Sequence, residues 1–161
     1  MSKIIRLTKA TTISQKLRGA GKTIVLVGGC FDILHLGHIK FLEEAKKADG
    51  ILFIALESDH NVRRRKGGAR PINSQKDRAK ILAALKHVDF VILLPDMRGF
   101  DNYFEMVETI NPHFIAVTEG DYHFDLKKRQ AEKIGAQILV VTPVLRTKST
   151  TKIAQLLEKE I

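Results

Sequence analysis

The chain has 161 residues, of which 44% are hydrophobic and 28% charged, and its formal net charge is +9 at pH 7. This composition is typical of one globular domain with a full core, and no apolar run approaches the roughly 20 residues that span a bilayer. The N-terminus lacks the apolar segment of a signal peptide, and a single cysteine cannot form an internal disulfide, so we expect a cytoplasmic location. The positive charge attracts polyanions and phosphorylated small molecules without distinguishing between them.

Residues 1–22 predict a polar lead-in with one short helix, and residues 23–161 predict the core of a single domain. Apolar, β-branched runs predict strands at residues 23–27, 51–56, 88–94, 113–118 and 137–142. Apolar residues at helical spacing predict helices after residue 38 and at residues 74–85, 102–110, 127–134 and 149–160. This alternation predicts an α/β fold with one doubly wound parallel sheet of about five strands.

A glycine turn follows the first of these strands, and its residues are Gly28, Gly29, Cys30, Phe31 and Asp32. His35 and His38 stand where the next helix begins, and their spacing places the two Cβ atoms about 5 to 6 Å apart on one helical face. The first turn of a helix offers free N–H groups and a partial positive charge to an anion. Glycines let the backbone come close to a ligand. The segment therefore predicts a phosphate site without a P-loop lysine.

Other interpretations of this segment are weaker. A zinc site would need a third and usually a fourth ligand, and the remaining histidines have no suitable spacing: His60, His87, His113 and His123. A pair of structural histidines would leave the neighbouring glycines unexplained. Cys30 is interpreted as a small buried residue rather than a nucleophile, because no histidine and carboxylate can be placed beside it.

Two further segments carry candidate phosphate ligands. Residues 57–73 contain Arg63-Arg64-Arg65-Lys66 and three glycine or proline positions, which predict a mobile basic loop at the carboxyl end of the second strand. Open α/β sheets bind ligands at this edge, so the loop is either a phosphate lid or a solvated charge run. The hydroxyls of residues 149–151 lie at a predicted helix start, where they either cap the helix or hold the far side of a triphosphate.

Three segments together resemble the small cytidylyltransferase-like nucleotidylyltransferases: His-x-Gly-His after the glycine turn, residues 74–88 (SQKDRAKILAALKHV) and residues 149–153 (STTKI). Within that group, residues 17–22 (LRGAGK) and 62–73 (VRRRKGGARPIN) are most similar to the heptose 1-phosphate adenylyltransferase domain. Glycerol-3-phosphate cytidylyltransferase is similar through residues 38–40 and through Arg146-Thr147. The resemblance implies a Rossmann-like nucleotidylyltransferase fold.

The resemblance also implies a reaction. A nucleoside monophosphate moves from a nucleoside triphosphate, with ATP favoured over CTP, to a phosphorylated acceptor such as heptose 1-phosphate, and pyrophosphate is released. Glycerol 3-phosphate, flavin mononucleotide and phosphopantetheine are the alternative acceptors. Mg²⁺ is expected to accompany the triphosphate, with few dedicated protein ligands. A homodimer is implied by analogy, and neither a nucleic-acid nor a membrane partner is expected.

Carried over residue by residue, the resemblance implies that the catalytic residues are His35, His38, Lys66 and Arg78. It implies that the nucleotide is bound by Gly28, Gly29, Cys30, Phe31, Asp32, His35, His38, Asp121, Arg146, Ser149, Thr150 and Thr151. Glu119 departs from the family, which usually has a lysine and two glycines before this aspartate, and its carboxylate would repel a nearby phosphate. A nucleotide sensor without turnover and a basic nucleic-acid-binding module are the non-enzyme alternatives.

Overall fold

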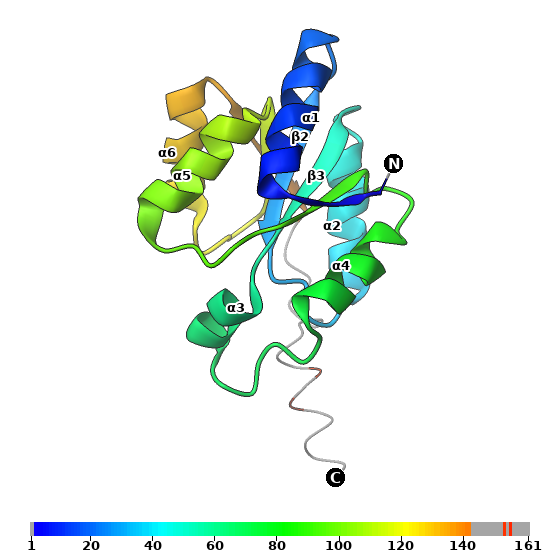
Figure 1. The fold of residues 1–161 in the computed structure, drawn as a ribbon, viewed down its shortest axis with the longest axis vertical. Coiled ribbons are helices and arrows are strands. Elements are labelled where there is room, and N and C mark those ends of the chain that lie inside the picture. Colours follow the sequence, from blue (N-terminus) through cyan, green and yellow to red (C-terminus); the bar gives the residue numbers. More distant parts are fainter. Residues whose placement is uncertain (1, 143–152, 154, 156–161) are drawn as a thin grey trace.

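A six-stranded parallel sheet organises the protein, which we describe from a computed structural model covering residues 2–142, 153 and 155 (Figure 1). The strand order is β1-β4-β3-β2-β5-β6. The strands are β1 (Ile4–Arg6), β2 (Ile24–Gly29), β3 (Ile51–Leu56), β4 (Phe90–Leu93), β5 (Phe114–Thr118) and β6 (Gln137–Thr142). The α/β class and the parallel sheet are as predicted from the sequence.

The strand missing from the sequence prediction is β1, so the sheet has six strands rather than five. It pairs in parallel with β4, with Ile4 opposite Val91, and forms one edge of the sheet. A three-residue strand with one buried side chain, Ile5, leaves almost no periodic signal. The segment 1–22 is therefore not only a helical lead-in, because it contributes a strand as well as a helix.

Two helical layers cover the sheet (Figure 1). One face is covered by α1 (Leu7–Gly19), α5 (Gly99–Ile110) and α6 (Phe124–Ile134), and the other by α2 (Leu36–Lys46) and α4 (Gln75–Ala83). Each layer has its own apolar core, because β2 and β3 are buried on both sides and alternate their side chains between the two. No helix among the described residues is long and apolar enough to cross a membrane.

The sheet reverses its order beside β2. From β2 the chain runs outward through β3 to β4, and it then crosses back so that β5 pairs with the other side of β2. Such a switch point opens a crevice at the carboxyl ends of the strands, where α/β sheets bind ligands. The glycine turn leaves β2 at this point, so the fold places it in the crevice.

The basic segment after β3 is a helix, α3 (Asp59–Lys66), and not the loop that the sequence predicts. The Ser58 hydroxyl caps it by accepting a hydrogen bond from the Asn61 N–H at 3.1 Å. Asp59 lies in the first turn and the four basic residues in the last, which suits the helix dipole at both ends. Figure 1 shows α3 beyond the carboxyl end of β3, apart from both helical layers.

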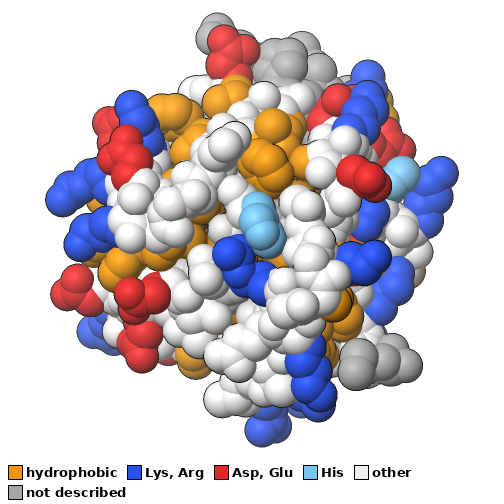
Figure 2. Space-filling view, turned by 90° about the horizontal axis from the view of Figure 1, so that it is seen from above, with side chains coloured by type: hydrophobic (Ala, Val, Ile, Leu, Met, Phe, Trp, Pro, Cys, Tyr) orange, Lys and Arg blue, Asp and Glu red, His pale blue; other side chains and the backbone are white. Residues whose placement is uncertain are grey.

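The opposite end of the molecule carries charges of both signs. Seen from above, Lys and Arg side chains alternate with Asp and Glu around apolar patches (Figure 2). No continuous basic surface is visible on this face among the described residues, so the positive charge of the chain is not concentrated there.

Candidate active site

The glycine turn at the end of β2 closes around the ring of Phe31. A Cβ atom at Gly29 would lie 2.7 Å from the Phe31 Cε2 atom, so only glycine fits there without moving the ring. Phe31 itself is buried and has a φ of +46°, which is uncommon for a residue with a side chain. Its ring contacts His38, with ring centroids 5.1 Å apart. The turn is therefore packed against His38 through the Phe31 ring.

His35 and His38 lie at the N-terminal end of α2, as predicted. His35 is the N-cap residue, and its carbonyl accepts hydrogen bonds from the N–H groups of His38 and Ile39 at 2.9 and 3.2 Å. The Nδ1 atoms of both imidazoles are buried and have no hydrogen-bond partner within the part of the chain that the structure describes. Buried polar atoms are normally paired, so two such atoms beside a helix N-terminus are a feature of a ligand site.

Both histidines favour the neutral form. Burial, and then the charge of neighbouring His35, lowers the pKa of His38 from 6.5 to about 4. Burial also lowers the pKa of His35. At neutral pH each imidazole therefore has one N–H donor and one acceptor nitrogen, and the pair is uncharged until an anion arrives.

Asp32 fastens the glycine turn to the segment after α3. Its carboxylate accepts hydrogen bonds from the backbone N–H groups of Ile72 and Asn73 at 2.9 to 3.0 Å and pairs with the Arg70 guanidinium. The side chain is 1% exposed. Burial alone would raise the pKa of Asp32, but the donors from Asn73, Ile72 and Arg70 outweigh it and hold the pKa below 3.8. Asp32 is thus placed to order the turn.

Arg78, expected to contact substrate phosphate, is buried instead. It is 1% exposed, and its guanidinium donates to the carbonyl oxygens of Cys30, Glu57 and Asn73 and to the carboxylate of Asp59. These partners lie at the ends of β2 and β3 and at the starts of α3 and α4. Arg78 therefore joins four segments around the site and does not face the cavity.

A cavity of about 680 Å³ opens at the switch point, between the sheet and α3, α5 and α6. Its deep wall is apolar and includes Leu26, Ala55, Leu94, Met106, Val107 and Ile115. Its polar wall includes Glu57, Arg65, Lys66, Tyr103, Asp121, His123 and Lys127. The volume is in the range of pockets that take small molecules.

The structure divides the predicted site residues into groups. Gly28, Gly29, Cys30, Lys66 and Asp121 line the cavity. Phe31, Asp32, His35, His38 and Arg78 lie around the turn and are not among the described residues that line it. Arg146, Ser149, Thr150 and Thr151 lie outside the described residues, as does most of the predicted final helix, of which 153 and 155 are described as helical.

Asp121 lies three residues before α6, and its carboxylate accepts hydrogen bonds from the His123 N–H and from the Lys127 ammonium, both at 2.7 Å. Glu119 is exposed and is not among the described residues of the cavity wall. Water screens an exposed carboxylate, so the repulsion expected from Glu119 is reduced.

Sequence reasoning missed Glu57, Asn61 and Tyr103, whose side chains form one hydrogen-bonded group with Arg65. The position of Glu57 directly after a buried strand was a usable signal. Tyr103 comes from α5, 46 residues further along the chain, and nothing local pairs it with Glu57.

No group of three or more His, Cys, Asp or Glu side chains gathers anywhere in the described residues in a way that could hold a metal ion. The donors at the site are imidazoles, N–H groups and cations, which suit phosphate oxygens. The carboxylates of Glu57 and Asp121 on the cavity wall are paired with Arg65 and Lys127.

Known proteins match this arrangement. The family model described as cytidylyltransferase-like matches residues 26–155. Among curated proteins, bifunctional protein HldE from Aliarcobacter butzleri is 38% identical over 92% of this chain and 30% of its own length. The HldE of Nitratiruptor is 40% identical over 89% of this chain and 29% of its own length. The chain thus spans about 30% of the length of these curated relatives.

Solved structures agree. A lipopolysaccharide core biosynthesis protein from Thermoplasma volcanium has a TM-score of 0.61 and 28% identity, and the match covers 77% of this chain and 98% of that one. A pantoate-beta-alanine ligase from Francisella tularensis, at 18% identity with a TM-score of 0.62, covers 94% of this chain and 75% of its own and supports the fold alone. The resemblance predicted from the motifs is confirmed, and the chain belongs to the cytidylyltransferase-like family.

Proposed function

We propose that the protein transfers a nucleoside monophosphate from a nucleoside triphosphate to a phosphorylated sugar and releases pyrophosphate. ATP is the favoured nucleotide and heptose 1-phosphate the first candidate acceptor. The observation that carries the proposal is the pair His35 and His38, whose buried Nδ1 atoms are unpartnered at a helix N-terminus beside a glycine turn. Family membership supports nucleotidyl transfer as the reaction that uses such a pair.

In this reaction an oxygen of the acceptor phosphate forms a bond to the α-phosphorus of the triphosphate. The bond from the α-phosphorus to the bridging oxygen breaks, and pyrophosphate leaves with the electron pair. Such transfers depend on positioning and on stabilisation of the developing negative charge, without a protein nucleophile. We assign the donors on the leaving pyrophosphate to His35, His38 and the N-terminus of α2, with Lys66 as the cation on the cavity side.

The cavity next to the turn is the proposed acceptor site. It borders Gly28, Gly29 and Cys30, so an acceptor held there would lie against the backbone that binds the nucleotide. At Gly28 a Cβ atom would meet nothing within 4 Å, which leaves the backbone open on that side. A sugar acceptor is supported by the relative from T. volcanium, whose description names lipopolysaccharide core biosynthesis.

Three further proposals accompany this function. Mg²⁺ would accompany the nucleotide and neutralise part of the charge of its phosphates. A cytoplasmic location is favoured by the single cysteine. A homodimer is proposed by analogy with the family, and sedimentation equilibrium tests it.

A screen for pyrophosphate release tests the function. It crosses the four common nucleoside triphosphates with heptose 1-phosphate, glycerol 3-phosphate, flavin mononucleotide and phosphopantetheine. We expect release with ATP and heptose 1-phosphate, and its loss in the variant His35→Asn/His38→Asn, which keeps the polarity of both side chains. Nucleotide binding without release for any pair would show a sensor instead of an enzyme.

A further inference from the structure

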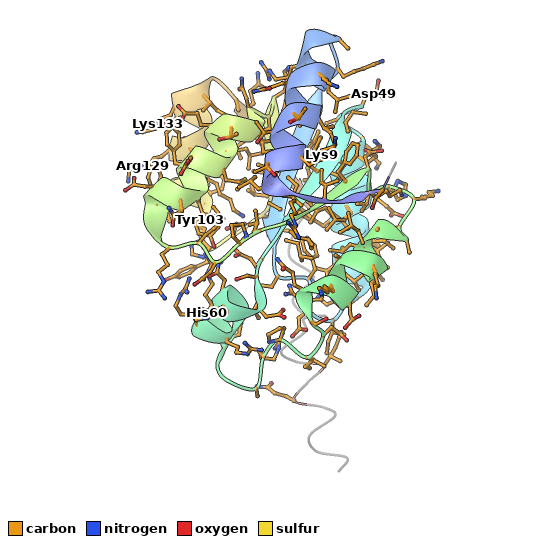
Figure 3. The ribbon with its side chains drawn as sticks, viewed as in Figure 1. Lys9, Asp49, His60, Tyr103, Arg129 and Lys133 are labelled. Carbon is orange, nitrogen blue, oxygen red and sulfur yellow. The ribbon has the colours of Figure 1, made fainter. Side chains whose placement is uncertain are left out.

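The hydroxyl of Tyr103 lies at the centre of a polar group on the cavity wall. It donates to the Glu57 carboxylate, whose two oxygens are both 2.9 Å away, and it accepts from Arg65 Nη2 at 2.8 Å and from Asn61 Nδ2 at 3.1 Å. In Figure 3, Tyr103 projects from α5 toward the end of the molecule where α3 lies. The hydroxyl thus ties α5 to α3 and to the end of β3.

Glu57 supplies the negative charge of this group. Its side chain is 6% exposed and accepts from Arg65 Nη1 at 3.0 Å and from Asn61 Nδ2 at 2.9 Å, in addition to Tyr103. Its oxygens are therefore satisfied by protein donors. A buried carboxylate costs several kcal/mol of desolvation in order of magnitude, so an ion pair of this kind is poor evidence for a role in stability.

Arg65 is held on one side and open on the other. Glu57 and the Tyr103 hydroxyl each take one terminal nitrogen, and the Tyr103 ring lies 5.4 Å from the guanidinium carbon. The side chain is nevertheless 34% exposed and lines the cavity. A guanidinium has more N–H groups than these two contacts use, and its planar fork matches two oxygens of a phosphate.

The field of Arg65 also reaches across the cavity. Burial, and then the positive charge of Arg65, lowers the pKa of His123 on the opposite wall. Arg65 is paired with Glu57, whereas its neighbour Lys66 forms no ion pair with another of the described residues. The two basic side chains therefore differ, because Lys66 supplies charge whereas Arg65 supplies a fixed geometry.

We propose that Glu57 and Tyr103 are positioning residues that fix the Arg65 guanidinium on the cavity wall as the anchor of the acceptor's phosphate. The inference rests on the proposed function, because it assigns one end of the acceptor to a named cation. The anchor favours a phosphorylated acceptor, since a phosphate offers the fork two charged oxygens whereas the hydroxyls of an unphosphorylated sugar are neutral. We assign the triphosphate to the histidines and Lys66, so nucleotide binding is expected to depend little on Arg65.

The variant Tyr103→Phe tests the positioning role, because it keeps the ring that packs against Arg65 and removes only the hydroxyl. We expect the KM for the acceptor to rise about tenfold, on the scale of one hydrogen bond to a charged group. The KM for the nucleotide and kcat are expected to stay within about twofold. The double variant Tyr103→Phe/Arg65→Lys should be no worse than Arg65→Lys alone, because both changes disturb the same anchor.

Arg64→Lys is the matched control. Arg64 is the neighbouring arginine of α3, and it binds Asp96, Asn61 and the Met97 carbonyl rather than lining the cavity. If the group were merely structural, Tyr103→Phe and Arg64→Lys would lower the melting temperature alike and leave the acceptor KM unchanged. That result, or an equal rise in both KM values, overturns the proposal.

Binding measurements test the Arg65 anchor even if the protein has no measurable turnover. If the wild-type protein releases no pyrophosphate with any acceptor, the proposed function fails, and titration calorimetry with heptose 1-phosphate and with inorganic phosphate then tests the anchor directly. Weaker phosphate binding in Arg65→Lys and Tyr103→Phe, but not in Arg64→Lys, supports it. Equal binding by all four proteins overturns it.

Discussion

The imidazoles of His35 and His38 are stacked, with ring centroids 3.8 Å apart and planes inclined by 25°. Two rings this close cannot both carry a positive charge without repulsion, which adds to the burial that keeps His38 neutral. A polyanionic ligand reverses the balance, because its charge stabilises imidazolium at the same place. The stack is therefore a donor pair whose charge depends on the ligand.

The substitution His38→Asn is expected to lower kcat about 10²-fold or more, since it removes one preorganised donor from the transition state. His35→Asn should act similarly. Pyrophosphate release measures the effect, and circular dichroism should show an intact fold. His60→Asn is the control, because His60 lies on α3 with a side chain that is 60% exposed (Figure 3). Unchanged turnover in both site variants would contradict the assignment.

Acid should destabilise the protein through His38. The unfolded chain takes up a proton as the pH falls through 6.5, whereas folded His38 does so only near pH 4. This contribution to stability is present above pH 6.5 and is lost between 6.5 and 4, to a total of about 3 kcal/mol. Urea unfolding at pH 7 and pH 5 measures the loss. In His38→Asn the difference between the two pH values should shrink, and an equal difference would speak against a neutral His38.

Nucleotide binding should be coupled to proton uptake. A triphosphate raises the pKa of both histidines, so near pH 6 the complex holds more protons than the separate components. Calorimetric titrations in two buffers of different ionisation enthalpy give the number of protons taken up. The uptake should fall toward zero at pH 8. A binding enthalpy that does not depend on the buffer at pH 6 would exclude this coupling.

Asp32→Asn should loosen the segment after α3. The amide oxygen replaces a carboxylate that accepts two backbone N–H groups and pairs with Arg70, so we expect a loss of about 2 kcal/mol in unfolding free energy. Hydrogen exchange should accelerate at Ile72 and Asn73. Asp96→Asn, which breaks a more exposed ion pair with Arg64, should cost about 1 kcal/mol or less. Equal losses of unfolding free energy in the two variants would show that the buried Asp32 contacts stabilise the protein no more than the exposed Asp96 ion pair.

Arg78→Met should lower stability more than any exposed arginine variant. It leaves the Asp59 carboxylate and three carbonyl oxygens without their donor, a change of about 3 kcal/mol or more. Chemical denaturation measures it. If the variant instead keeps wild-type stability and only the KM for a substrate rises, Arg78 contacts that substrate, as the sequence predicts.

Much of the architecture is readable from the sequence because the central strands are buried on both faces and appear as unbroken apolar runs, such as Ile51–Leu56. The histidine pair is readable because its parts are adjacent in the chain. The short edge strand Ile4–Arg6 could not be predicted in this way. Its three residues are too few to show a periodic pattern, and they form a strand because they pair with β4. The clustered arginines of α3 predict a loop exposed to solvent, whereas the Ser58 cap and the helix dipole favour the helix that the structure has.

The cavity wall was the least predictable part of the site. Glu57 and Tyr103 belong to different elements and meet only after the sheet has formed, and no local pattern relates a tyrosine on α5 to a carboxylate at the end of β3. The burial of Arg78 was hidden for the same reason, because its acceptors are backbone carbonyls contributed by distant segments.

The glycine turn contacts two compartments of the site: Phe31 packs on His38 in one, and Gly28, Gly29 and Cys30 line the cavity, which is the other. A substitution on the cavity wall at a position other than Lys66 can alter the fit of an acceptor without touching the groups assigned to pyrophosphate. Divergence within such a fold can then proceed by successive neutral steps in one compartment while the transfer chemistry is inherited unchanged. The departure at Glu119 is one step that this arrangement would tolerate, because its side chain is exposed and is not among the described residues that line the cavity.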